Sequence, residues 1–423
     1  MNFPNKAEIV VVGAGPAGST TAAVAAKAGA DVLIVDRKNH IGVPVQCGEA
    51  IGKSKSELER LEIPKNSIVN TISGFRIYSP SNIPVTWYRD ETQGYIVDRR
   101  VFDKELFAKA VEMGANTLLG LSVTGIIWEN GLPKGVLGIF RGEKVEIRAD
   151  IIIGADGVNS VIARETGLRS YIRREDLDTS VGYDMVNVEL DEPHWMDFFV
   201  GLEVAPRGYV WVFPQGETRA NIGIGVGVGF GEKTVYQYLH DFMEKHSIGA
   251  KICKNARPIE FRVGAIPVGG PPKKTVTNGV ILVGDAAGQV HPLTGGGISY
   301  SMTAATVGGE VAQKCLLEGD VSEEALAEYE KGWREKLEEK FALGLRMRKL
   351  LEVMTDEQLD KLAQNLSGDN IVELVSGRLK KIWKYIKFRL KEPEIAKLLK
   401  QAIKGEGKFI EEKEEEEDEE QEA

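Results

Sequence analysis

A glycine-rich turn near the amino terminus could bind the pyrophosphate of a dinucleotide. Gly13, Gly15 and Gly18 follow the apolar stretch 9–12 and precede an alanine-rich stretch. The first glycine would allow a sharp turn, the second would let the backbone approach a pyrophosphate at a helix start, and the third would allow close helix packing. Asp36 ends the next apolar stretch, where a carboxylate can accept hydrogen bonds from ribose hydroxyls. The pattern predicts a dinucleotide with a plain adenosine ribose and does not distinguish FAD from NAD.

Two later segments place an acid beside a glycine at the end of an apolar strand. Asp156 lies in the turn after 151–154, and Asp285 follows the strand 280–283. An acid in this position can bind the hydroxyls of a polyol. The residues 295–298, Gly-Gly-Gly-Ile, open a predicted helix, and free N–H groups there could face a flat, electron-accepting ring. These two segments favour FAD.

A third group of residues could form an apolar binding wall. Tyr209, Trp211 and Phe213 alternate along a predicted strand, so their rings share one face. The following strand alternates apolar residues with glycines, including Gly223 and Gly225, which would leave one face bare. This arrangement suits a long apolar chain. The alternative is that the aromatic residues are core and the glycines relieve crowding.

To position these residues, the chain is expected to form two interleaved domains. Residues 7–36, 150–167 and 279–317 read as one α/β layer, and 180–268 alternate as antiparallel strands do. The predicted fold class is α/β plus β, a Rossmann-like nucleotide domain with an inserted antiparallel sheet. The predicted boundaries are 1–45, 95–180 and 270–320 for the FAD-binding domain, 46–94 and 181–269 for the substrate domain, 321–410 for a helical region and 411–423 for a disordered acidic tail.

The net charge of −10 is a cancellation between blocks. Residues 411–423 hold ten acids and one lysine, whereas 378–404 hold ten basic residues and two acids. The pattern of residues 378–391 predicts a basic amphipathic helix that carries aromatic side chains. Such a helix would bind an anionic membrane surface. The alternative is an ordinary helix whose apolar stripe packs on the core. Nucleic-acid binding is disfavoured, because no supporting fold is evident.

Composition excludes several classes of protein. No apolar run approaches the roughly twenty residues of a membrane span, and the first residues show no signal peptide. A cytoplasmic protein is therefore expected. It would contact the membrane peripherally if the basic helix binds there. Cys47, Cys253 and Cys315 are too far apart for a metal site or an iron–sulfur cluster. The five histidines show no ligand pairing, so no metal is predicted. His291 would either cap a loop or lie near the cofactor ring.

The three nucleotide motifs, in this order, resemble those of the FAD-dependent oxidoreductases of the p-hydroxybenzoate hydroxylase superfamily. Within it the chain resembles the geranylgeranyl reductases, close to the archaeal branch that saturates the isoprenoid chains of digeranylgeranylglycerophospholipids. The resemblance rests on Pro44-Val-Gln-Cys-Gly-Glu-Ala50, on Tyr209-Val-Trp-Val-Phe-Pro214 with Gly223-Ile-Gly225, and on the segment from Gly284 to Ile298. The chain departs from the family pattern at Gln215, where the pattern has lysine.

The resemblance implies a set of contacts. Arg99 would reach the flavin, although an ion pair with a neighbouring acid is the alternative. Tyr209, Trp211, Phe213, Gly223 and Gly225 would bind the substrate. FAD would contact Gly13, Gly15, Ala17, Gly18, Asp36, Cys47, Gly48, Ala50, Arg99, Asp156, Asp285, Gly297 and Ile298.

The implied reaction is hydrogenation of isolated double bonds in an isoprenoid phospholipid. Such a reaction needs a proton donor as well as a hydride, and Cys47 is the candidate, with water or Tyr209 as alternatives. Cys47 would otherwise only pack against the ring. The electron donor would be NADPH or a reduced ferredoxin. The competing functions are a flavin-dependent monooxygenase or halogenase of the same superfamily and an electron-transferring flavoprotein.

Overall fold

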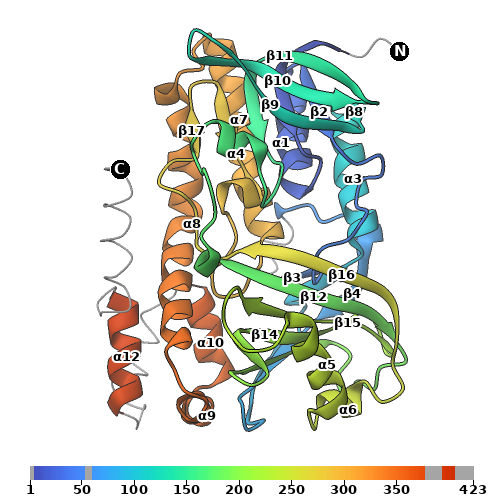
Figure 1. The fold of residues 1–423 in the computed structure, drawn as a ribbon, viewed down its shortest axis with the longest axis vertical. Coiled ribbons are helices and arrows are strands. Elements are labelled where there is room, and N and C mark those ends of the chain that lie inside the picture. The colour runs from blue at the N-terminus through green and yellow to red at the C-terminus, as the bar shows by residue number, and fades with distance from the viewer. Residues whose placement is uncertain (1–3, 53–59, 377–392, 405–423) are drawn as a thin grey trace.

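The computed structural model describes residues 4–52, 60–376 and 393–404 (Figure 1). The segments 378–391 and 411–423, predicted above as a basic helix and an acidic tail, lie outside these residues. An eight-stranded sheet forms the upper part of the molecule in Figure 1 and a seven-stranded sheet the lower part. The predicted fold class, a Rossmann-like layer with a second sheet and a helical C-terminal region, is confirmed. The exact domain boundaries stay a prediction.

The eight-stranded sheet has a parallel centre in the order β18-β11-β1-β2-β8. Antiparallel β10 pairs with β11, and β9 pairs with β10. The strands are β1 (Lys6–Val12), β2 (Val32–Asp36), β8 (Asn116–Leu119), β9 (Leu121–Glu129), β10 (Leu132–Phe140), β11 (Glu143–Gly154), β17 (Val276–Thr277) and β18 (Val280–Leu282).

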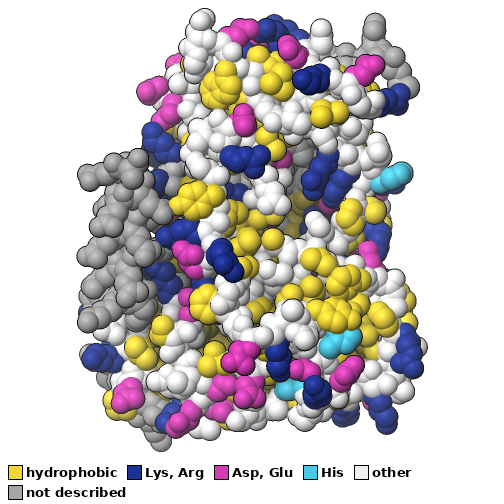
Figure 2. All heavy atoms as spheres, viewed as in Figure 1, with side chains coloured by type: hydrophobic (Ala, Val, Ile, Leu, Met, Phe, Trp, Pro, Cys, Tyr) yellow, Lys and Arg dark blue, Asp and Glu magenta, His cyan; other side chains and the backbone are white. Residues whose placement is uncertain are grey.

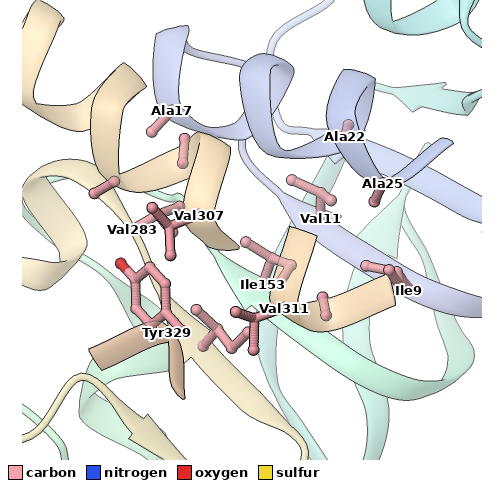
Figure 3. Packing of buried hydrophobic residues seen from close by; sticks show 14 of the residues in the cluster. Ile9, Val11, Ala17, Ala22, Ala25, Ile153, Val283, Val307, Val311 and Tyr329 are labelled. Atoms are coloured by element: carbon pink, nitrogen blue, oxygen red, sulfur yellow. The ribbon is translucent and has the colours of Figure 1, made fainter. Parts of the chain in front are cut away.

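Both faces of the sheet are buried at its parallel centre, which explains the continuous apolar runs 9–12, 32–35 and 280–282. Ile9 and Val11 pack against the helices α1 (Pro16–Lys27) and α7 (Ile298–Glu318), whereas Val10 and Val12 face the side covered by β9, β10 and α4 (Val161–Glu165). Figure 3 shows small alanines of α1 beside valines of the sheet and of α7. Small side chains let α1 approach closely, which fixes the glycine turn that precedes it.

The seven-stranded sheet has the order β16-β12-β15-β14-β13-β5-β6. Its neighbours are antiparallel except β13 and β5, which run parallel. The strands are β5 (Gly74–Tyr78), β6 (Pro84–Tyr88), β12 (Leu177–Val186), β13 (Trp195–Gly201), β14 (Ala205–Pro214), β15 (Arg219–Gly227) and β16 (Arg257–Pro267). Helices α5 (Val235–Lys245) and α6 (Gly249–Ile252) cover one face, so the other face is left for the site.

A small sheet joins the two parts. It consists of β3 (Ala50–Gly52), β7 (Gly94–Val97) and β4 (Ile68–Ile72). Ile51 and Val97 pack with α3 (Arg99–Glu112) and α7, while Ile72 and Ile96 pack with the aromatic residues of β14. The segment before α3 is therefore held between the two large sheets.

The first and longest of the C-terminal helices runs along both parts of the molecule, and the others lie beside the lower part (Figure 1). They are α8 (Glu323–Glu352), α9 (Asp356–Asn365), α10 (Gly368–Val375) and α12 (Pro393–Lys404), and the short 3₁₀ helices are η1 (Lys65–Ser67), η2 (Arg174–Asp176) and η3 (Gly284–Ala287). The first half of α8 packs on the nucleotide layer and its second half on α12. Within the described ranges no helix is both long and apolar enough to cross a membrane.

Candidate active site

The glycine turn between β1 and α1 has the geometry of a pyrophosphate site. Gly13 has a φ of +106°, and a Cβ there would lie 2.3 Å from the carbonyl oxygen of Ala155. A Cβ on Gly18 would lie 1.8 Å from the carbonyl oxygen of Gly13, so neither position accepts another residue. Nothing lies within 4 Å of the Cβ position of Gly15. This open space lies at the N-terminus of α1, where free N–H groups favour an anion.

Asp36 is fixed against the same turn. Its carboxylate accepts hydrogen bonds from the backbone N–H groups of Ala14 and Lys38, both at 2.8 Å. Each carboxylate oxygen keeps a further lone pair for a ribose hydroxyl. The predicted position of Asp36 at the end of β2, beside the glycine turn, is confirmed.

A cavity of about 240 Å³ extends from this turn to the seven-stranded sheet. It brings together residues that lie more than 280 positions apart in the chain. The predicted site residues that line it are Gly15, Ala17, Cys47, Gly48, Arg99, Trp211, Asp285, Gly297 and Ile298. The cavity therefore joins the expected nucleotide end to the expected substrate wall.

Asp285 is a carboxylate short of donors inside this cavity. It follows β18, and its Oδ1 lies 3.4 Å from the Cβ position of Gly297. Burial raises the pKa of the Asp285 carboxyl, while Arg99 and Arg169 act in the opposite direction. No hydrogen bond to its carboxylate is formed by the described part of the chain. Asp285 thus fits a ligand that brings hydroxyl groups, as the ribityl chain of FAD does.

The N-terminus of α7 opens on the same cavity. Gly297 is its N-cap and offers no side chain to accept from the first N–H groups of the helix. Gly297, Ile298 and Ser301 all line the cavity. The positive end of a long helix therefore opens on the cavity, where it favours an electron-rich or anionic group.

Arg99 forms the ion pair that was the alternative to flavin contact, and its contact with the flavin stays a prediction. Its Nε and one terminal nitrogen contact the two carboxylate oxygens of Asp103 at 2.6 and 2.9 Å, and it also lines the cavity. Burial alone would lower the pKa of Arg99, but Asp103 and Cys47 raise it above its usual value. The ion pair fixes the guanidinium beside Cys47, so it orients Arg99 at the cavity and does not remove it from the site.

Cys47 lies at the centre of the site. Its Sγ accepts a hydrogen bond from the backbone N–H of Glu49 at 3.2 Å and interacts with Arg99. Its carbonyl oxygen accepts from Asn221 and Arg262, both at 3.2 Å. These contacts hold the loop before β3 on the floor of the cavity.

The aromatic residues of β14 share one face, as predicted. Phe213 stacks near Trp211 with ring centroids 6.0 Å apart, and Tyr209 meets Trp211 edge-on at 6.1 Å. A Cβ on Gly48 would lie 3.0 Å from the ring of Phe213, so the wall reaches the residue next to Cys47. Ala50 packs in the same cluster. The rings are partly core and partly cavity wall, since Trp211 lines the cavity.

The two glycines of β15 have different surroundings. A Cβ on Gly223 would lie 2.3 Å from the Trp211 ring, so the indole covers this glycine. Nothing lies within 4 Å of the Cβ position of Gly225, which pairs with Tyr209 across the sheet. The expectation of a bare face is therefore wrong at Gly223 and holds only at Gly225, because the large Trp211 ring fills the space opposite the first glycine.

The Asp156 carboxylate forms its hydrogen bonds with residues close to it in the sequence. Its carboxylate accepts from the hydroxyl of Ser160 and from the backbone N–H of Val161 at 2.7 Å, at the start of α4. Its neighbours Ala155 and Gly157 line the cavity. Burial raises the pKa of Asp156, and these hydrogen bonds counteract it. The carboxylate organises the turn whose backbone borders the cavity.

A buried polar network beneath the wall was not among the predicted site residues. The Glu49 side chain is fully buried and accepts from the backbone N–H of Arg99 at 2.9 Å, from Gln215 at 3.0 Å and from Arg262 at 2.5 Å. Asn221 accepts from the Trp211 indole at 2.9 Å. The one sequence signal was Gln215, the departure from the family's lysine, which here donates to Glu49.

His291 is buried beside the site. The backbone N–H of Thr294 donates to its Nδ1 at 3.3 Å, and its ring stacks on Tyr300 with centroids 5.8 Å apart. This supports the loop-capping alternative. Within the described ranges no group of three His, Cys, Asp or Glu side chains is placed to hold a metal ion.

Comparison with known proteins agrees with this geometry. Residues 176–266 match the family model of the geranylgeranyl reductase catalytic domain, and residues 11–61 match that of an NAD(P)-binding Rossmann-like domain. A digeranylgeranylglycerophospholipid reductase of Methanocaldococcus jannaschii is 43% identical over 85% of this chain and 90% of its own length. One from Methanococcoides burtonii is 36% identical over 95% and 98%, respectively.

Solved structures show the same fold. A geranylgeranyl bacteriochlorophyll reductase-like protein from Thermoplasma acidophilum superposes with a TM-score of 0.84 at 31% identity, over 94% of this chain and 100% of its own. A flavin-dependent brominase superposes with a TM-score of 0.68 at 18% identity, over 88% and 94%, and at that identity shares only the fold.

The Rossmann-type layer and the inserted sheet define the fold class that the geranylgeranyl bacteriochlorophyll reductase-like protein and the flavin-dependent brominase share with this chain. Within that class, the 43% and 36% identity to the two reductases named above, over 85% and 95% of this chain, shows that the chain belongs to the geranylgeranyl reductase family.

Proposed function

We propose that this chain hydrogenates the isoprenoid double bonds of 2,3-digeranylgeranylglycerophospholipids with FAD, giving saturated archaeol-type lipids for membrane lipid biosynthesis. The observation that carries the proposal is that Cys47, Trp211 and the N-termini of α1 and α7 all line one cavity. The relatives that bear the name of this activity support the substrate class.

The residues present fit FAD. The open side of Gly15 and the start of α1 would hold the pyrophosphate, and Asp36 the adenosine ribose. Asp285 would accept from the ribityl hydroxyls, and the first N–H groups of α7 would face the ring. Reduced FAD held by these residues would supply the hydride for one carbon of the double bond.

The second carbon of the double bond requires a proton. An isolated trisubstituted alkene has no carbonyl to polarise it, so an acid must lie close to the reacting carbon. Cys47 lines the cavity and interacts with Arg99. Tyr209 is disfavoured, because its hydroxyl donates to the carbonyl oxygen of Thr294 at 2.5 Å and burial raises its pKa. We therefore favour Cys47 over Tyr209 as the proton donor.

The aromatic wall would bind the chain and exclude water. Trp211 is fixed by its hydrogen bond to Asn221, and Phe213 by its contact with Gly48. Rigid apolar side chains gain binding energy from a polyprenyl chain without a polar partner, roughly 25 cal/mol for each Å² buried. The gap at Gly225 leaves space for a methyl branch.

A direct test uses the purified protein under anaerobic conditions. FAD is confirmed from the absorption spectrum and reduced, and digeranylgeranylglyceryl phosphate is then added. Mass spectrometry should show the lipid gaining hydrogens in pairs as the flavin reoxidises. Oxygen uptake coupled to hydroxylation, with no anaerobic saturation, would instead support the monooxygenase alternative.

The electron donor is part of the proposal and is either NADPH or a reduced ferredoxin. The two are distinguished by mixing the oxidised holoenzyme with each donor in a stopped-flow instrument. The physiological class of donor should bleach the flavin faster than the lipid is reduced at steady state, and the other class should not.

A further inference from the structure

The outer edge of the seven-stranded sheet carries an apolar patch. β16 is the edge strand, and its side chains alternate: Ile259, Phe261 and Val263 are 55, 51 and 46% exposed, whereas Arg262 between them is buried. Tyr236 of the neighbouring α5 is 45% exposed. These four residues are called the β16 patch below. Figure 2 shows apolar side chains gathered on this part of the surface, below a hollow.

Such a patch is unusual at a sheet edge. Edge strands are normally protected by charged side chains, and contiguous exposed apolar surface marks an interaction site. The rings are held in place by their neighbours, since Phe261 lies 5.2 Å from Tyr183 and 6.3 Å from Tyr236 between ring centroids. Tyr236 in turn contacts His240 at 4.2 Å. The patch is thus a preformed surface.

Basic side chains lie at one end of this surface. Lys251 and Lys254 of the α6 region and Arg257 at the start of β16 are all exposed. Cationic residues beside apolar ones complement an anionic lipid surface, which attracts each nearby lysine or arginine by about 1 kcal/mol. An apolar protein partner would not require these charges.

The same strand leads into the candidate active site. Val263 belongs to the β16 patch and also lines the cavity, followed by Gly264, Ala265 and Ile266. A Cβ on Gly264 would lie 3.7 Å from the carbonyl oxygen of Gln46, next to Cys47. β16 therefore runs from the exposed patch to the floor of the site.

We propose that the β16 patch docks on an anionic phospholipid bilayer, so that an isoprenoid chain can move from the bilayer along β16 to the cavity. The proposal rests on the lipid substrate proposed above. It does not involve residues 378–391, so it is separate from the docking predicted for that segment. A second copy of this chain pairing along the edge of β16 is the alternative occupant.

The test is sedimentation of the full-length holoenzyme with vesicles of phosphatidylcholine containing phosphatidylglycerol. The double variant Ile259→Glu/Phe261→Glu should bind at least about tenfold more weakly than the wild type, because charged side chains are costly to place among acyl chains. Lys254→Glu/Arg257→Glu should lose the preference for anionic vesicles. The matched control is Ile139→Glu on β10, 43% exposed on the other sheet, which should bind as the wild type does.

FAD absorbance and a thermal melt establish that each variant is folded. If the substitutions on β16 disturb the strand, Tyr236→Glu on α5 serves as a second variant of the patch. Equal binding by the wild type and both patch variants overturns the proposal. A second result would also overturn it: light scattering shows a dimer that the patch substitutions dissociate, and neither the wild type nor any variant binds vesicles.

Activity separates this proposal from the proposed function. The patch variants should lose reduction of substrate embedded in vesicles by about the same factor as binding, and keep reduction of detergent-dispersed substrate. If the wild type reduces no lipid in either form but binds vesicles through the patch, the proposed function fails and the docking surface stands.

Discussion

Cys47 lies where the cavity meets the aromatic wall, and this position decides its proposed role. If it supplies the proton, Cys47→Ala should slow the oxidation of reduced flavin by substrate at least about 100-fold in single-turnover measurements, while FAD content stays the same. Cys47→Ser, whose hydroxyl is a much weaker acid, should behave similarly. Unchanged rates in both variants would leave Cys47 with only a packing role.

Glu49 illustrates a residue whose importance depends on distant partners. It pairs with Arg262, and the two side chains are 0 and 4% exposed. Glu49→Ala should lower the free energy of unfolding by about 3–5 kcal/mol, because it leaves Arg262 buried with less compensating charge. Urea unfolding measures this loss, with the exposed Glu244→Ala as a control expected to lie within about 0.5 kcal/mol of the wild type. A similar small change in Glu49→Ala would contradict the role assigned to the network.

These residues also show what sequence reasoning reaches. The positions of Gly13, Gly18 and Asp36 follow from local backbone requirements, and the structure has them as predicted. Glu49 contacts residues 166 and 213 positions away, so no local pattern reveals its partners. A buried network is therefore the part of a site that spacing alone does not predict.

At the scale of elements, the strand β15 offers a discriminating pair of substitutions. Gly223→Ala should destabilise the fold by about 1–3 kcal/mol, because its Cβ would overlap the Trp211 ring. Gly225→Ala should have little effect on stability, since its Cβ position is open.

If the isoprenoid chain of the substrate occupies the open space at Gly225, Gly225→Leu should raise KM without changing FAD binding. Thermal melts and steady-state kinetics with dispersed lipid test both statements, and equal destabilisation by the two alanines would contradict them.

The elements differ in how far the sequence predicts their neighbours. The parallel centre of the eight-stranded sheet follows from the strand–turn–helix repeat. The parallel pairing of β13 with β5 does not, because it joins segments about 120 residues apart. The glycine alternation in β15 predicts a bare face, but only the structure shows that Trp211 covers part of it.

At the scale of the whole molecule, α8 connects the two layers. Tyr329, near its start, donates to the carbonyl oxygen of Leu282 at 2.7 Å in the nucleotide layer. Arg348, near its end, donates to the carbonyl oxygens of Val268 and Glu175 at 2.8 and 2.6 Å beside the seven-stranded sheet. The sequence predicts a helical region at 321–410, but it does not reveal that Arg348 is buried between the layers. Contacts of this kind depend on the assembled fold.

The buried end of α8 should make stability depend on pH. Asp178 lies 3.8 Å from Arg348, and burial raises the pKa of its carboxyl to about 6, partly offset by Arg348. The folded protein therefore holds this proton more tightly than the unfolded chain does. The resulting stabilisation is complete below about pH 4 and is lost as the pH rises through about 6, by up to about 3 kcal/mol. Asp178→Asn cannot ionise, so the difference in unfolding free energy between variant and wild type should grow in favour of the variant from pH 4 to pH 7. Urea titrations at several pH values measure it, and a difference that stays constant over this range would show that Arg348 keeps Asp178 ionised throughout.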